Sequence, residues 1–263
     1  YKRRYEYEES GESSYLAFVC ACIRELEKRV EGTVLSIGVT VPGVVRSSGL
    51  IKHIPEIPEW EKYNLQEELQ RRFGVDVLVE NDTRMMTLGY YEMKLREQYS
   101  DLVYIFAKNA LSAGIVIGGR LHRGLDNFAG ELGFLLLPEN LGSAGAPANG
   151  RGDLETAVME LQRRIGGQPG NKELLYRYYD LLAEGIVAVS CVTAPQIVVL
   201  HGKYLDEGVL EYIRERIRPY FPKDVMPQLQ LNDDASCSVQ GMIGECVRHS
   251  IEKSAKLGEL TIR

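Results

Sequence analysis

Two short stretches of this chain carry residue types that can hold a hydroxyl-rich ligand. Asn81 and Asp82 place an amide and a carboxylate directly after the apolar run 75–79, and Glu131 stands in a glycine-flanked loop about fifty residues later. A carboxylate at a strand end can accept two hydroxyl donors, and neighbouring glycines let the backbone approach a ligand closely. These residues therefore suit a clamp for sugar hydroxyls. The alternative for Asn81 or Asp82 is helix capping, which contributes ~1 kcal/mol, and one residue can do both.

The elements that must position these residues alternate between strand and helix patterns. A β-branched run over 34–41 is typical of a strand buried on both faces, and the Gly/Ala/Pro/Asn-rich segment 137–152 is a loop. Alternating strands and helices predict a mostly parallel sheet. We expect strands at 1–8, 34–41, 75–79, 102–106 and 197–200, a hairpin partner at 115–121, and helices at 15–30, 65–73, 83–98, 154–164, 173–193 and 239–256.

Composition narrows the class of protein. The 263 residues carry a net charge of −6, which argues against this chain gripping a nucleic-acid backbone by itself. No apolar run reaches the ~20 residues of a membrane span, and no signal peptide opens the chain. The five cysteines are scattered, as free thiols in a reducing compartment would be. We expect a cytoplasmic protein without membrane contact, and interpret the start at Tyr1, without a methionine, as a fragment or a chain whose first residues are missing.

An ordered set of motifs identifies a family resemblance. Ile-Gly-Val-Thr-Val-Pro-Gly spans 37–43, Val-Glu-Asn-Asp spans 79–82, a run ending in Gly-Glu-Leu-Gly spans 118–133, and Gly-Arg-Gly-Asp-Leu-Glu spans 150–155. In order and spacing this set resembles the ROK family (repressors, open reading frames and sugar kinases). The resemblance implies a two-lobed, actin-like (ribonuclease H-like) α/β fold of the ATPase and sugar kinase type, commonly dimeric, with sugar bound in the cleft.

The resemblance also implies how the chain divides. We expect an N-terminal α/β lobe over 1–99, incomplete because its first hairpin would precede Tyr1, with 246–263 packing back on it. The larger C-terminal α/β lobe would span 100–245.

Residue by residue, the resemblance implies roles for the clamp. Asp82 matches the general base of ROK kinases, a catalytic role only if this chain is a kinase, and Asn81 matches the residue that holds neighbouring hydroxyls. Glu131 and Glu155 match sugar-contacting glutamates, and Gly43 would shape the cleft floor. Glu155 could instead be a first-turn residue favoured by the helix dipole, and Pro42-Gly43 a plain tight turn.

The chain departs from the family at the zinc site. Family members bind zinc with a histidine after Gly-Glu-Leu-Gly and three cysteines. Phe134 stands at the histidine position, Asp153 at the last cysteine, and no Cys or His lies between 134 and 155. A tetrahedral site cannot be built from these residues. We expect no zinc, and a loop held by apolar packing of 134–137.

The nucleotide motifs also depart from the family. The second phosphate-binding loop corresponds to 107–114, where two glycines and the threonine are missing, which hinders close approach of phosphates. The first phosphate loop would lie upstream of Tyr1, and His201-Gly202 replaces a Gly-Gly near the adenine pocket. We expect no cofactor.

Three hypotheses follow. The first is the sugar-sensing effector and dimerisation domain of a ROK-type transcriptional repressor, which binds a hexose or related sugar without phosphorylating it. Such a protein would form homodimers and contact DNA through an N-terminal helix-turn-helix that this chain does not contain. The alternative is an ATP-dependent sugar kinase with Asp82 as general base. The third is a vestigial clamp in a domain that only dimerises.

Overall fold

The computed structural model describes residues 14–54, 56–137 and 151–261, and the strand predicted over 1–8 lies outside them. The chain divides into two compact units: unit 1 comprises 1–80 and 245–263, and unit 2 comprises 81–244. This first boundary lies 19 residues before the one expected at 99. The intervening residues form α3 (Asp82–Tyr90) and the π-helical turn η2 (Tyr91–Leu95), and α3 packs on strands of unit 2.

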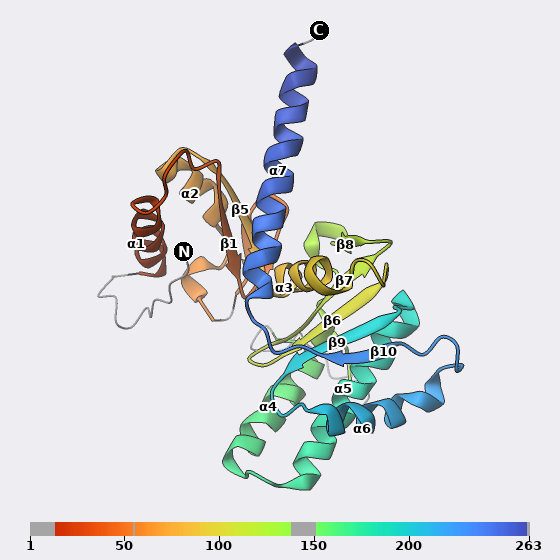
Figure 1. Ribbon diagram of the computed structural model, residues 1–263. Helices are drawn as coiled ribbons and strands as arrows, with labels where there is room; N and C mark the ends of the chain where they lie inside the picture. The colour runs from red at the N-terminus through yellow and green to blue at the C-terminus, as the bar shows by residue number, and fades with distance from the viewer. Residues whose placement is uncertain (1–13, 55, 138–150, 262–263) are drawn as a thin grey trace. The chain divides into compact units, whose positions relative to one another are not determined.

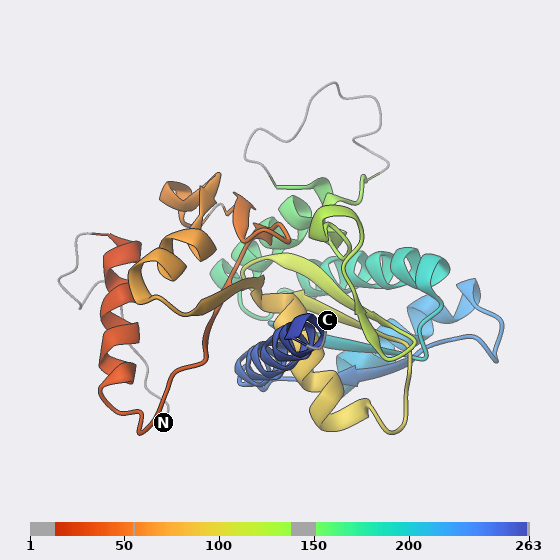
Figure 2. The same ribbon diagram turned by 90° about the horizontal axis from the view of Figure 1, so that it is seen from above.

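The described residues of unit 1 form two α-helices, the later turns of a third α-helix and two small sheets. The hydroxyl of Ser14 caps α1 (Tyr15–Glu27), and Gly74 ends α2 (Leu65–Phe73) in the left-handed conformation. Both helices lie side by side (Figure 2) and share an apolar core with strands of the unit. The strands are β1 (Ser36–Val41) paired with β5 (Asp76–Asn81), and β2 (Val44–Val45), β3 (Leu50–His53) and β4 (Tyr63–Asn64) in a second sheet.

The long helix α7 (Cys237–Thr261) begins in unit 2 and ends in unit 1. Within unit 1, the Lys253 ammonium is 2.6 Å from a carboxylate oxygen of Asp76 on β5. Among the described residues, every helix is too short or too polar to cross a lipid bilayer.

Unit 2 contains a five-stranded sheet in the order β10-β9-β6-β7-β8. The bounds are β6 (Leu102–Ala107), β7 (Leu111–Ile117), β8 (Arg120–His122), β9 (Ile197–Gly202) and β10 (Gln228–Leu231). β10, β9 and β6 are parallel, whereas β7 and β8 are antiparallel to their neighbours. The expectation of a mostly parallel sheet was therefore wrong: the sheet is mixed (Figure 1).

β7 corrects a second expectation. It begins at Leu111, before the predicted 115, and pairs with β6 from Ala107↔Leu111 to Leu102↔Val116. Gly118 and Gly119 form the next turn, between β7 and β8. Residues 107–114 are therefore a β-hairpin with a three-residue turn.

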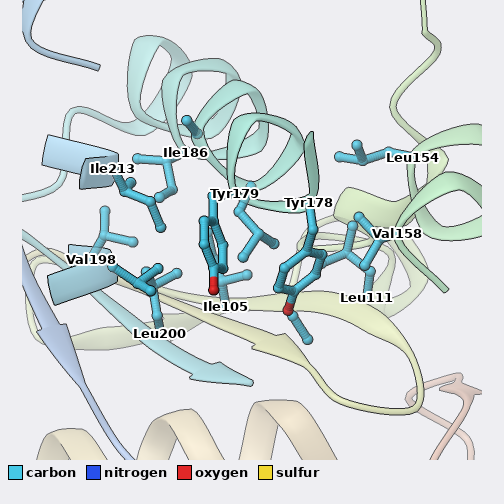
Figure 3. Packing of buried hydrophobic residues seen from close by; sticks show 14 of the residues in the cluster. Ile105, Leu111, Leu154, Val158, Tyr178, Tyr179, Ile186, Val198, Leu200 and Ile213 are labelled. Carbon is cyan, nitrogen blue, oxygen red and sulfur yellow. The ribbon is translucent and has the colours of Figure 1, made fainter. Parts of the chain in front are cut away.

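Side-chain alternation along β6 assigns the two faces of this sheet. Val103 and Ile105 point to the core shared with α4 (Asp153–Gly167), α5 (Lys172–Thr193) and α6 (Glu207–Ile217) (Figure 3). Tyr104 and Phe106 point to the opposite core, which includes residues of α3. Neither α6 nor β10 was predicted, although the buried positions of α6 follow helical spacing. The sheet thus holds α3 on one face and α4 on the other.

Candidate functional site

Asn81 and Asp82 take different places at the start of α3. Asn81 is the N-cap: its buried side-chain oxygen accepts a hydrogen bond from the Arg84 amide at 2.9 Å. Asp82 is the first helical residue, and its carboxylate accepts from the Thr83 amide at 2.7 Å. Capping therefore accounts for Asn81, whereas Asp82 is partly buried at the first position of the helix.

Two hydroxyls join the start of α3 to β7. The Thr83 and Ser112 side-chain oxygens are 2.8 Å apart, and Thr87 donates back to the Thr83 carbonyl at 2.7 Å. A Cβ at Gly114 would come within 1.9 Å of the Thr87 hydroxyl, so this contact requires glycine. The first turn of α3 is therefore fixed against the strand that precedes the Glu131 loop.

Arg84 joins α3 to that loop, and sequence reasoning missed it. The side chain is 2% exposed, and its guanidinium donates to the backbone carbonyl of Asn127. Asn127 is itself buried and has a φ of +63°, in the left-handed region that asparagine tolerates better than most residues. A single arginine in a helical pattern carries no sequence sign of burial, and its apolar neighbours Met85 and Met86 were the available signal.

The Glu131 loop is hydrogen-bonded to β7 through Gly130. The Ala113 amide donates to the Gly130 carbonyl at 2.6 Å. Gly130 has a φ of +92°, and a Cβ there would lie 1.9 Å from the Ala113 carbonyl oxygen. Only glycine lets the loop run this close to the strand. The backbone on the N-terminal side of Glu131 is thereby held in place.

Glu155 approaches the same loop from the first turn of α4. Its side chain is 13% exposed and accepts from the Arg151 guanidinium at 3.0 Å. A Cβ on Gly133 would lie 2.8 Å from the Glu155 Cβ and 3.3 Å from its carboxylate oxygen. Glu155 is thus both a first-turn acidic residue, as the helix dipole favours, and a neighbour of the loop that carries Glu131.

The electrostatics of Glu131 join these residues into one site. Burial raises the pKa of Glu131 to about 7; the Arg84 guanidinium opposes this shift, while the charges of Glu155 and Asp82 add to it. The Glu131 carboxylate therefore interacts with two other carboxylates and one guanidinium, and we call these four groups the carboxylate cluster. Near neutral pH, Glu131 is present in both protonation states, so it can donate as well as accept a hydrogen bond.

Gly43 lies in unit 1, outside this cluster. A Cβ there would lie 2.5 Å from the His53 carbonyl oxygen and 2.9 Å from the Ile54 side chain. Close packing within unit 1 accounts for the glycine, and its predicted contact with sugar stays a prediction.

The residues at the family's zinc position do not fit a metal. Within the described ranges, no three His, Cys, Asp or Glu side chains are placed to hold an ion. The ring centroids of Phe134 and Phe128 are 5.7 Å apart, so the two rings pack together. Phe134 is nevertheless 38% exposed, and Leu136 is 62% exposed. Of the four residues expected to hold the loop by apolar packing, Leu137 is buried and Leu135 packs against the core, whereas Leu136 is mostly exposed.

The residues at the family's phosphate loop do not fit a phosphate cradle of the nest type. Such a cradle needs consecutive amides in alternating right- and left-handed conformation, and no residue of 107–114 has a positive φ. The Ala107 carbonyl accepts from Gln162 at 2.9 Å and from the Lys203 amide at 3.2 Å. His201 is 1% exposed, and its ring nitrogen is 2.7 Å from the Tyr104 hydroxyl.

The chain is similar in sequence to repressors and to sugar kinases of known function. A putative xylose repressor from Caldicellulosiruptor sp. (strain Rt8B.4) is 33% identical over 108 residues, 41% of this chain and 27% of that protein. The glucokinase of Thermotoga maritima is 24% identical over 251 residues, covering 81% of this chain and 77% of the enzyme. The matches to this repressor and to the xylose repressor of Caldicellulosiruptor bescii cover only about a quarter of the length of those proteins.

The fold has solved counterparts. A ROK family transcriptional regulator described as a homolog of the E. coli MLC protein superposes with a TM-score of 0.72 at 20% identity, covering 89% of this chain and 68% of that one. This likeness shows the actin-like α/β fold of ROK sugar kinases and regulators. The ROK family model matches residues 8–158, more than half of the chain, and the chain therefore belongs to the ROK family.

Proposed function

We propose that this chain is the sugar-sensing effector domain of a ROK-type transcriptional repressor, and that it binds a pyranose sugar without phosphorylating it. The observation that carries the proposal is the carboxylate cluster. Asp82, Glu131 and Glu155 come from three separate elements of unit 2, and the charges of Asp82 and Glu155 both act on Glu131. Convergent carboxylates are the acceptors that a ring of hydroxyl donors needs.

The charge balance of the cluster suits a neutral ligand. Arg84 offsets part of the negative charge of the three carboxylates, and Arg151 pairs with Glu155. Hydrogen bonds to charged groups contribute ~1.5–3 kcal/mol each. Two or three such bonds support an affinity in the micromolar to millimolar range, which is adequate for sensing an abundant sugar.

The β6–β7 hairpin supports sensing over phosphoryl transfer. That reaction depends on a cradle that positions phosphate groups and stabilises their charge. At 107–114 the alternate side chains Ala107, Leu111 and Ala113 are buried in the apolar core instead. His201, which stands at the family's adenine-pocket glycine, is buried among aromatic rings.

A repressor also requires DNA contact and a ligand-driven change. We assign DNA contact to a helix-turn-helix module outside this chain, in a homodimer located in the cytoplasm. The sugar would have to bind the DNA-competent and released states unequally, because a ligand shifts an equilibrium only by its differential affinity.

Calorimetric titration with D-xylose and D-glucose tests the proposal, because the relatives include xylose repressors and a glucokinase. We expect saturable binding of one sugar without MgATP, weakened at least tenfold in Asp82→Asn and in Glu131→Gln. Glu160→Gln, on the exposed face of α4, is the matched control and should bind as the parent does. Absence of binding by any pyranose in a broader panel would overturn the proposal.

Two observations favour the kinase alternative: Asp82 stands at the position of the family's general base, and the Thermotoga maritima glucokinase matches most of this chain. A coupled assay for ADP formation with sugar and MgATP separates the two. Turnover that Asp82→Asn abolishes would replace sensing by catalysis, whereas sugar binding without ADP formation supports the sensor.

A further inference from the structure

An apolar groove of about 370 Å³ adjoins the carboxylate cluster within unit 2. One wall comes from β7 and the loop that carries Glu131, and the other comes from the last turns of α5. The twelve lining residues are Ala113, Ile115, Phe128, Gly130, Glu131, Leu132, Phe134, Leu135, Ala188, Val189, Val192 and Thr193.

The groove is almost devoid of polar partners. Among the described residues that line it, only Glu131 and Thr193 have polar side chains. The Thr193 hydroxyl donates to the Val189 carbonyl at 2.8 Å, so its proton is used within α5. Glu131 remains, and it is the residue that the groove shares with the carboxylate cluster.

The apolar walls stand open to solvent. Val192 is 85% exposed and Phe128 47%. Exposed apolar surface of this kind is stabilised when another apolar group covers it. A bare sugar ring is a poor occupant, because its hydroxyls would lose their hydrogen bonds to water and find few replacements there.

We propose that this groove is the subsite for an apolar aglycone, an aryl or alkyl group attached to a sugar ring that the carboxylate cluster holds. The inference rests on the proposed function and narrows its ligand class to glycosides. An apolar cavity of about 150 Å³ is enough to hold benzene, so 370 Å³ accommodates an aromatic ring and its linking atoms.

A second copy of the chain is the competing occupant, and the size of the groove argues against it. A stable protein interface uses roughly 20–30 residues on each side, whereas twelve line this groove. Its continuity with the carboxylate cluster through Glu131 also favours a small ligand that reaches both.

Calorimetric titration of the full-length protein tests the subsite. The probes are D-xylose, both anomers of 4-nitrophenyl D-xylopyranoside, the corresponding D-glucose set, and 4-nitrophenol alone. We expect one aryl glycoside to bind about 10- to 100-fold more tightly than its free sugar, as burial of one aromatic ring provides. 4-Nitrophenol alone should bind more weakly than that glycoside.

Two substitutions in the groove test whether the groove is the source of the tighter binding of the aryl glycoside. Val192→Gln alters a side chain that is 85% exposed, so folding should tolerate it. The variant should lower the affinity for the aryl glycoside at least fivefold and leave the affinity for the free sugar unchanged. Phe128→Ala should act in the same direction. Val225→Gln, at a position 53% exposed outside the groove, is the matched control and should keep the tighter binding.

The outcomes separate this inference from the proposed function. The subsite is overturned if the aryl glycosides bind no more tightly than the free sugar, or if both groove variants keep the tighter binding. Either result leaves the sensing proposal intact. If neither sugars nor glycosides bind, both fail. If Val192→Gln dissociates a dimer in sedimentation without changing glycoside affinity, the groove is an interface between copies and the subsite is overturned.

Discussion

Two stretches that border β7 differ in backbone strain. In the loop 124–133, Gly124, Asp126, Asn127 and Gly130 all have positive φ, whereas the turn 108–110 of the β6–β7 hairpin has no such residue. Left-handed backbone at non-glycine residues costs about 1–3 kcal/mol each and persists only where surrounding contacts enforce it. The fold thus concentrates strain where Glu131 is presented and leaves relaxed the hairpin that corresponds to the family's phosphate loop.

Replacement of the buried Arg84, which supports the strained loop, should have the largest effect on stability. In Arg84→Met, the Asn127 carbonyl loses its donor and Glu131 loses its neighbouring positive charge. Breaking a buried polar pair costs about 3–5 kcal/mol, so we expect the free energy of unfolding in urea to fall by about 3 kcal/mol or more. Arg163→Met, which breaks an exposed pair with Glu160, should cost less than about 1 kcal/mol. Equal losses in the two variants would contradict a supporting role for Arg84.

Gly130→Ala tests how closely the loop must approach β7. The variant adds a Cβ that would lie 1.9 Å from the Ala113 carbonyl oxygen at a φ of +92°. Gly170 offers a matched control, since its φ is +88° and a Cβ there meets nothing within 4 Å. Gly170→Ala should cost only the conformational penalty of about 1–2 kcal/mol, and Gly130→Ala about 1 kcal/mol more, together with loss of sugar binding. Urea unfolding and calorimetry measure the two quantities.

The sequence predicted the polar residues that follow apolar runs, but it did not predict the contacts of buried polar side chains. Asp82 and Glu131 follow strand or glycine signals, and the structure joins them with Glu155 through electrostatic interactions, although their contact with sugar stays a prediction. Arg84 was missed because burial of one charged residue depends on the loop 124–133, which packs against it from far along the chain.

The start of β7 was predicted too late for a different reason. The comparison of 107–114 with a glycine-rich phosphate-binding loop took no account of its strand pattern. The alternation of Leu111, Ala113 and Ile115, all facing the core, indicated a strand with period two. Local periodicity was therefore the better guide to fold here, whereas the ordered motifs were the better guide to family.

The pH dependence of stability should report the burial of Glu131. Its pKa rises from 4.5 to about 7 in the folded state, so the folded protein retains a proton that the unfolded chain has already released. The stabilisation is fully present below about pH 4.5 and is lost as pH rises through about 7, a decrease on the order of 2–3 kcal/mol. Glu131→Gln should remove this decrease between pH 5 and pH 8, while Glu160→Gln should keep it. Parallel pH profiles for parent and Glu131→Gln would show that Glu131 is not the group.

The smallest effect belongs to the hydroxyl pair that fixes α3 on β7. Thr83 and Ser112 are 2.8 Å apart at the edge of the cluster, and a neutral hydrogen bond contributes about 1 kcal/mol net. Ser112→Ala should therefore lower the free energy of unfolding by about 1 kcal/mol. It should weaken sugar binding only slightly, because Asn81 still caps α3 and keeps Asp82 in place. A double-mutant cycle with Thr83→Val isolates the pair. A coupling near zero would mean that the close approach of α3 at Gly114, rather than this hydrogen bond, positions Asp82.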